Sequence, residues 1–316
     1  MLSSECFAYS IHSGLTEGCH ERITRTAFLS SLPSFNPDPS IPIPTSEAWQ
    51  RFAEGMIKAN RFADDFPQLE DDAFKLMFIS TIVGVRSPDT EGHATSNLAR
   101  LRQIHADPDP QGQYAHALRG TYDDGATGDE IAILGLRKAI VELVTKSLES
   151  YRETPSQQLI SVPLYFDFYG IINIEVWAPA YYLGRALHAL QDSFAHTIRN
   201  DDLSLIRHVL NYVDAIEGHL DESRDGLPHS AHMDSCEGDI LPIAMTAMTA
   251  SAQLIAAVNL TVEMQNIEFT KEVLLQWLGY EPGCTFENDY CDSAWVALAR
   301  QEQTGPYLEE ALSCNQ

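Results

Sequence analysis

One stretch, Tyr181–Asn200, constrains this chain more than any other. Its sequence, YYLGRALHALQDSFAHTIRN, predicts a single helix in which His188, Asp192 and His196 follow one another at four-residue intervals. Four residues are just over one helical turn, so the three side chains lie on one stripe, beside an apolar stripe that faces a core. Imidazole, carboxylate and imidazole are metal-ligand groups, and this register predicts half of a metal site. The alternative is an ordinary polar face with scattered histidines.

The rest of the chain has the apolar periodicity of helices and no convincing series of alternating strands. We therefore predict an all-α fold, a single multi-helix domain with long loops. In it, 1–15 form a tail, about 16–235 carry the metal ligands and 236–316 complete the same core. The predicted helices are 16–31, 47–60, 70–85, 98–104, 129–153, 181–200, 203–219, 239–277 with a break near Asn266, and 293–312. Loops are expected at 31–46, 86–97, 107–128 and 220–238, and a strand pair or buried coil at 160–177.

The charge balance narrows the range of partners. The 316 residues include 20 basic and 45 acidic side chains, a formal net charge of −25. Such a surface repels nucleic acid and anionic lipid, so no stable nucleic-acid partner is expected. The uncharged run Ile240–Val262 is long enough to span a bilayer. Its alanines and threonines and its internal Pro242 favour a buried central helix instead, and we predict no transmembrane segment.

Cysteine usage points to an oxidising compartment. The six cysteines form no CxxC motif, and Cys284 and Cys291 bracket a polar, turn-like segment, which suggests disulfides. Buried free thiols are the alternative. Because disulfides form in oxidising compartments, we expect a secreted or periplasmic protein. The first residues do not read as a signal peptide, so the export signal has been removed or export takes another route.

Other segments must complete a metal site, because His, Asp and His on one helix cannot fill the coordination of two ions. Ligand-capable residues gather in loops and at helix ends, where functional groups commonly sit on a rigid scaffold. They are His20, Asp65, His93, His229, His232 and Asp234.

These residues give the chain a resemblance to zinc-dependent phospholipases C and the related single-strand-specific nucleases. The resemblance runs from about Gly18 to Asp234 and is most specific in LGRALHALQDSFAHT. It consists of an early His in HERIT, an Asp in RFADDFPQ, a loop His in RSPDTEGH, then His-x-x-x-Asp on a helix. It implies an all-helical fold with two or three zinc ions.

The resemblance also implies a role for each ligand. Asp65, His93, His188 and Asp192 would bind one zinc ion, and Asp192 would bridge to a second ion held by His20. His196 would hold a third ion with ligands from further along the chain. His229 with Asp234 is the first choice for these, and His219 with Glu222, or His232, the second. Asp65 would also act as the catalytic carboxylate that orients water.

One departure concerns the N-terminus. The best-known members of that family bind zinc through an N-terminal Trp, and this chain has no Trp before Trp49. His12 or Glu17 would replace that ligand, or the third ion would be absent.

The function implied is a phospholipase C that releases diacylglycerol from phosphatidylcholine-like lipids at a membrane surface. The acidic balance favours it over a single-strand-specific nuclease or 3′-nucleotidase, which must attract a polyanion. A non-catalytic relative, in which zinc only stabilises the fold, is the third possibility. Aromatic residues of Val162–Trp177 either line a choline pocket or belong to the core. We expect a monomer.

Overall fold

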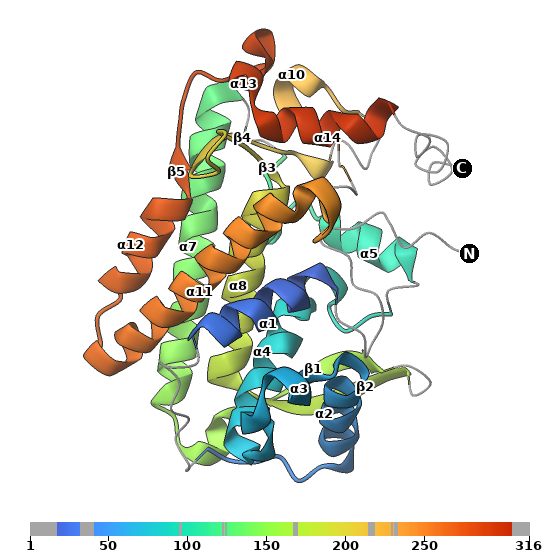
Figure 1. The fold of residues 1–316 in the computed structure, drawn as a ribbon, viewed down its shortest axis with the longest axis vertical. Coiled ribbons are helices and arrows are strands. Elements are labelled where there is room, and N and C mark those ends of the chain that lie inside the picture. The colour runs from blue at the N-terminus through green and yellow to red at the C-terminus, as the bar shows by residue number, and fades with distance from the viewer. Residues whose placement is uncertain are drawn as a thin grey trace.

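The computed structural model describes residues 18–31, 41–94, 97–121, 123, 125–166, 170–213, 219–228, 230 and 233–304. Helices dominate it, and two small sheets accompany them (Figure 1). The α-helices are α1 (Cys19–Ser31), α2 (Glu47–Asn60), α3 (Phe62–Asp65), α4 (Asp72–Thr90), α5 (Leu98–His105), α6 (Pro110–Ala115), α7 (Gly125–Tyr151), α8 (Ala178–Ala195), α10 (Glu222–Asp225), α11 (Leu241–Met264), α12 (Glu268–Trp277), α13 (Asp289–Asp292) and α14 (Ala294–Thr304).

The sheets lie at the two ends of α8. A hairpin of β1 (Leu159–Phe166) and β2 (Gly170–Trp177) precedes the helix. After it, β3 (Thr197–Arg199) pairs antiparallel with β4 (Leu205–Val209), and β4 pairs parallel with β5 (Gly279–Tyr280). The fold is therefore mostly helical, in agreement with the predicted class, and the two small sheets are an addition to the predicted all-α fold.

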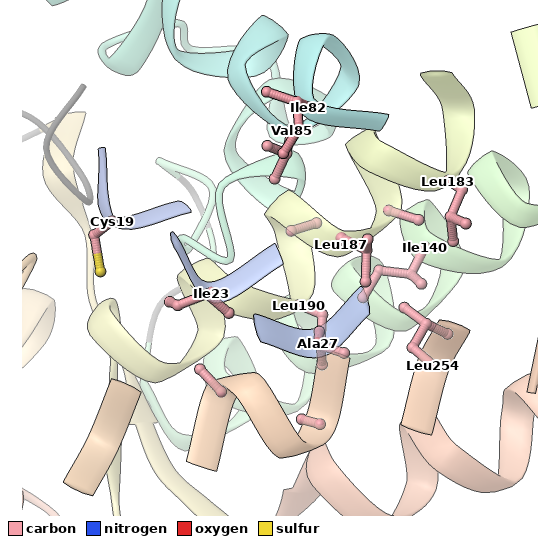
Figure 2. Packing of buried hydrophobic residues seen from close by; sticks show 14 of the residues in the cluster. Cys19, Ile23, Ala27, Ile82, Val85, Ile140, Leu183, Leu187, Leu190 and Leu254 are labelled. Carbon is pink, nitrogen blue, oxygen red and sulfur yellow. The ribbon is translucent and has the colours of Figure 1, made fainter. Parts of the chain in front are cut away.

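Helix α8 is the centre of the core, because it packs against α1, α4, α7 and α11. Only Tyr182 and Arg185 of its residues are not buried. Figure 2 shows its apolar stripe among side chains of the four surrounding helices. The labelled residues are Leu183, Leu187 and Leu190 of α8, with Cys19, Ile23 and Ala27 of α1, Ile82 and Val85 of α4, Ile140 of α7 and Leu254 of α11.

Two glycines let α4 and α8 cross with their backbones in contact. A Cβ atom on Gly84 would lie 2.2 Å from the carbonyl oxygen of Tyr181, and one on Gly184 would lie 2.3 Å from that of Thr81. Only glycine fits such an approach. The crossing lies about one turn before Asp89 on α4 and before His188 on α8, so it brings these two side chains toward each other.

Several sequence predictions hold. Helix α2 has the predicted bounds, and Ser46 caps its N-terminus by accepting a hydrogen bond from the Trp49 amide. The predicted break near Asn266 separates α11 from α12. The segment 160–177 is the strand pair, and its described residues Val162, Leu164, Ile174 and Trp177 are buried core. Of the aromatic residues in that segment, Trp177 belongs to the core and Tyr165 is partly exposed, whereas Phe168 and Tyr169 lie outside the described residues.

Other predictions are wrong at the ends of elements. The helix of Tyr181–Asn200 ends at Ala195, because Thr197–Arg199 leaves it to pair with β4. The predicted helix 203–219 contains a strand instead, in which Ile206, His208 and Val209 are buried. Helix α4 runs through Pro88 to Thr90, although Arg86–Asn97 was expected to be a loop. In each case tertiary packing overrides local propensity.

Helix α11 belongs to a segment, Gly238–Met264, that is long and apolar enough to cross a membrane. Half of its most apolar window is buried inside the protein, where α11 packs against α1, α8 and α12. This packing is typical of a core helix, and length and composition alone do not separate a core helix from a span.

The helix crossing gives a stability prediction. Gly84→Ala is expected to lower the free energy of unfolding by about 1–3 kcal/mol, because the added methyl group forces α4 away from α8. Urea unfolding measures the change. Gly112→Ala is the control, since the nearest atom to its Cβ would be 3.5 Å away. Equal stability of the two variants would contradict the tight crossing.

Candidate metal centre

Two buried carboxylates, Asp89 of α4 and Asp192 of α8, form the middle of the candidate site. Imidazoles surround them on several sides, and all the side chains involved are at most 4% exposed. The imidazoles belong to His20, His105, His116, His188 and His196. Two overlapping groups of these residues have donor atoms close enough to hold a metal ion: His20, Asp89, His188 and Asp192, and Asp89, His105 and His116.

Four of these residues lie at the C-terminal ends of helices, and these ends meet at the site. Asp89 lies in the last turn of α4, His105 is the last residue of α5, and His116 and His196 follow the last residues of α6 and α8. The C-terminal end of a helix carries partial negative charge. Four such ends around one point favour a cation there.

Four donor atoms lie close enough together to share one metal ion. His188 Nε2 lies 2.9 Å from Asp192 Oδ2, 3.5 Å from Asp89 Oδ1 and 3.1 Å from His116 Nδ1. His116 Nδ1 lies 3.2 Å from Asp192 Oδ2 and 3.6 Å from Asp89 Oδ1. Ligands about 2.0–2.2 Å from a tetrahedral zinc ion are separated by roughly 3.3–3.6 Å. Two of the five distances fall in this range and three are slightly shorter, so a bound ion would move the four donors apart by a few tenths of an ångström. His105 Nε2 lies beside them, 3.4 Å from the same Asp89 oxygen.

The second oxygen of each carboxylate faces His20. His20 Nε2 lies 3.1 Å from Asp192 Oδ1 and 3.8 Å from Asp89 Oδ2. Both oxygens are buried without a well-formed hydrogen bond, an arrangement that costs free energy unless a cation or proton occupies the space. The two carboxylates are therefore placed to be shared by two ions.

A third group, His196 and Asp234, lies beside the C-terminal end of α8. His196 Nε2 is 3.9 Å from Asp234 Oδ1, and its Nδ1 is 3.9 Å from Asp192 Oδ2. Both residues are buried, and the ring of Tyr212 packs against His196 with 4.9 Å between ring centroids.

The outer nitrogens of four imidazoles are held by acceptors that fix the ring orientation. Nδ1 of His188 donates to the Val85 carbonyl at 2.9 Å, that of His105 to the Leu101 carbonyl at 2.9 Å, and that of His196 to the His116 carbonyl at 2.7 Å. Nδ1 of His20 lies 2.7 Å from Gln191 Oε1. An acceptor on Nδ1 leaves the Nε2 lone pair directed at the centre, as in metal-binding histidines.

The ionisation of the group follows from its mixed charges. Burial acts to lower the pKa of His20, but the carboxylates of Asp192 and Asp89 outweigh it and raise that pKa to about 9. Burial acts to raise the pKa of Asp192, and His188, His196 and His20 hold it well below its usual value. Burial, His105 and His188 together lower the pKa of His116 to about 4. Without metal, protons on imidazole balance the carboxylates, and metal ions displace them.

The structure brings together part of the predicted ligand set. His20, His188 and Asp192 meet at the centre, and His196 and Asp234 lie beside it. His12, Glu17, His229 and His232 lie outside the described residues.

Four other predicted residues lie elsewhere. The carboxylate of Asp65 is 37% exposed and 3.6 Å from Arg25. His93 is half-buried and accepts a hydrogen bond from Arg100 at 3.3 Å. His219 is exposed, and Glu222 pairs with Arg300 at 3.0 Å. Asp89 and His116 take the places that were expected of Asp65 and His93.

The sequence did not predict Asp89, His105 or His116 as ligands. For Asp89 the reason is that Pro88 and the polar residues around it suggested a loop. A signal was present for Asp89. It lies seven residues after Ile82 and four after Val85, on the face of α4 that is buried. His105 and His116 end short helices in a loop-rich region, and the sequence has no periodic pattern that places them.

Two cysteine pairs lie at disulfide distance, Cys19–Cys236 and Cys284–Cys291, with Cα–Cα distances of 5.5 and 5.2 Å. The second is the pair that the sequence suggested. Cys6 and Cys314 lie outside the described residues. Two such pairs indicate an oxidising, extracellular type of environment.

Comparison of the chain with protein families, with curated proteins and with solved structures found no match. The metal centre therefore stands on the geometry of the chain itself.

The central carboxylate gives a metal-binding prediction. Asp192→Asn is expected to weaken metal binding at least about 100-fold, since both of its oxygens face donor groups and an amide binds divalent cations poorly. Elemental analysis and chelator competition on the purified protein measure it. Asp65→Asn serves as the control and should keep the wild-type metal content. Equal metal loss in both variants would contradict the assignment.

The raised pKa of His20 gives a pH prediction for the chelated protein. A folded-state pKa of about 9, above the ordinary 6.5, means that this group stabilises the metal-free fold below pH 6.5 and loses that contribution as the pH rises through 9. The Tm of chelated protein should fall over this range more steeply in the wild type than in His20→Gln. Metal-loaded protein should not show the difference, because the ion has displaced the proton. Parallel curves for the two chelated proteins would contradict it.

Proposed function

We propose that this chain is a zinc-dependent phosphodiester hydrolase of the phospholipase C type. The observation that carries the proposal is the pair of buried carboxylates, Asp89 and Asp192, each with its two oxygens facing different imidazoles. A pair of divalent cations would supply a water of lowered pKa and charge balance for the phosphoryl oxygens. Imidazole and carboxylate are donors that suit zinc.

The ligands divide into three groups. Asp89, His116, His188 and Asp192 would hold one ion, with His105 beside it. His20 and the second oxygens of the two carboxylates would hold a neighbouring ion. His196 and Asp234 would supply part of a third site, which agrees with the expectation of two or three ions.

Asp89 replaces Asp65 as the proposed catalytic carboxylate. Its Oδ2 accepts no well-formed hydrogen bond, and it lies 3.8 Å from His20 Nε2. An oxygen in this position can accept a hydrogen bond from a water molecule and orient it toward a phosphorus atom. Asp192 is less suited to this role, because its corresponding oxygen, Oδ1, lies closer to His20 Nε2, at 3.1 Å.

The proposed substrate is a zwitterionic phospholipid such as phosphatidylcholine. The net charge of −25 opposes a polyanion more strongly than a lipid of zero net charge. The cysteine pairs support the further proposal that the protein is secreted or periplasmic.

A second candidate is a structural metal centre without catalysis. The side chains of His20, His188, Asp192 and His196 have no exposed surface, and closed coordination is typical of ions that only stabilise a fold. Slight exposure remains at His105, His116 and Asp234. If the centre is catalytic, substrate reaches it from that side.

The test measures hydrolysis of phosphatidylcholine vesicles and of single-stranded DNA side by side by the zinc-loaded full chain. We expect lipid hydrolysis, and Asp89→Asn should lower it at least about 100-fold. His93→Ala is the matched control and should retain wild-type activity. Hydrolysis of DNA alone would favour the nuclease. Bound zinc that raises the Tm, with neither substrate hydrolysed, would establish the structural centre instead.

A further inference from the structure

The Cys19–Cys236 pair adjoins the metal centre at both of its ends. Cys19 opens α1 and directly precedes His20 in the chain, and Cys236 follows Asp234 by two residues. The two cysteines are 217 residues apart in sequence, and both are buried. The bond therefore joins the segment that carries His20 to the segment that carries Asp234.

These two segments approach Asp192 from different directions. His20 faces its Oδ1 at 3.1 Å, whereas Asp234 lies beyond His196, whose Nδ1 is 3.9 Å from Oδ2. The bond between Cys19 and Cys236 thus joins the two segments whose side chains lie on either side of the Asp192 carboxylate.

Besides the disulfide, the segment of Asp234 is held by buried neighbours, Met233 and Ile240, which belong to the core. Asp234 lies in a turn, outside any helix or strand. Arg22 and Glu237 form an ion pair at 2.9 Å between these segments, but the two side chains are 38% and 75% exposed, and exposed pairs contribute little. The disulfide links the two segments covalently and is a stronger connection than this exposed ion pair.

We propose that the Cys19–Cys236 disulfide is a positioning bond for the metal centre. It holds His20 and Asp234 at their places around Asp192 before metal binds. The free energy of metal binding is then not reduced by the entropy cost of ordering the two segments. The inference rests on the metal centre and is independent of whether the centre hydrolyses a phosphodiester.

The second cysteine pair provides a matched control. Cys284–Cys291 closes a loop with a sequence separation of seven residues, and no donor of the centre lies within or next to that loop. Loss of either disulfide lowers stability, but only loss of Cys19–Cys236 should alter metal binding.

The experiment compares the double variants Cys19→Ser/Cys236→Ser and Cys284→Ser/Cys291→Ser as full chains. Zinc stoichiometry and zinc dissociation constants are measured by chelator competition. The first variant should bind at least one zinc ion 10- to 100-fold more weakly than the wild type. The second should bind zinc with wild-type affinity even where its Tm falls. Wild-type affinity in the first variant overturns the proposal, and a wild type that binds no zinc overturns the metal centre itself.

A second measurement covers the case in which the first variant does not fold. The Cys284→Ser/Cys291→Ser protein is loaded with zinc and treated with a phosphine, which is oxidised to its phosphine oxide as water supplies the oxygen and the disulfide becomes two thiols. Free thiol and released zinc are followed together. Zinc release in step with the appearance of thiol supports the proposal. Thiols that appear while all the zinc stays bound contradict it.

Discussion

Asp89 and Asp192 are the interaction on which this structure depends. Two carboxylates buried side by side repel each other and have lost their hydration, a large cost inside a protein. The chain compensates with five imidazoles, each of which has a ring nitrogen within 4 Å of a carboxylate oxygen of Asp89 or Asp192. Protons can balance this charge only partly, because each imidazolium formed opposes the next. Divalent cations would balance it with all the imidazoles neutral, and the donor atoms of the cluster could hold a metal ion.

The helix crossing makes that arrangement possible. Gly84 and Gly184 let α4 and α8 approach backbone to backbone, and the residues about one and two turns further along then face each other. A wider crossing would separate Asp89 from His188, which are 3.5 Å apart between Oδ1 and Nε2. The apolar stripe of α8 and the glycine contact hold the helices, and the outer hydrogen bonds of the imidazoles set their direction.

The sequence predicted the parts of the centre that follow helical periodicity. His188 and Asp192 on one helix, and the early His20, were placed correctly beside one another. The prediction was wrong where tertiary contacts decide local structure. Pro88 suggested a helix end, but packing against α8 carries α4 past it to Asp89. His116 could not be found at all, because its position depends on where α6 ends in three dimensions. Periodicity identifies one helix face, whereas the partners of that face come from chain segments with no periodic pattern.

The charge of the whole chain and the charge of the centre act together. A net charge of −25 raises the local concentration of divalent cations and lowers that of polyanions. The C-terminal ends of α4, α5, α6 and α8 carry partial negative charge, and they add to the negative potential around the two buried carboxylates. Under the proposed function this potential selects substrate as well as metal. A phospholipid of zero net charge would reach the slightly exposed side at His105 and His116 without electrostatic repulsion, whereas a nucleic acid would first have to overcome the repulsion of the surface charge.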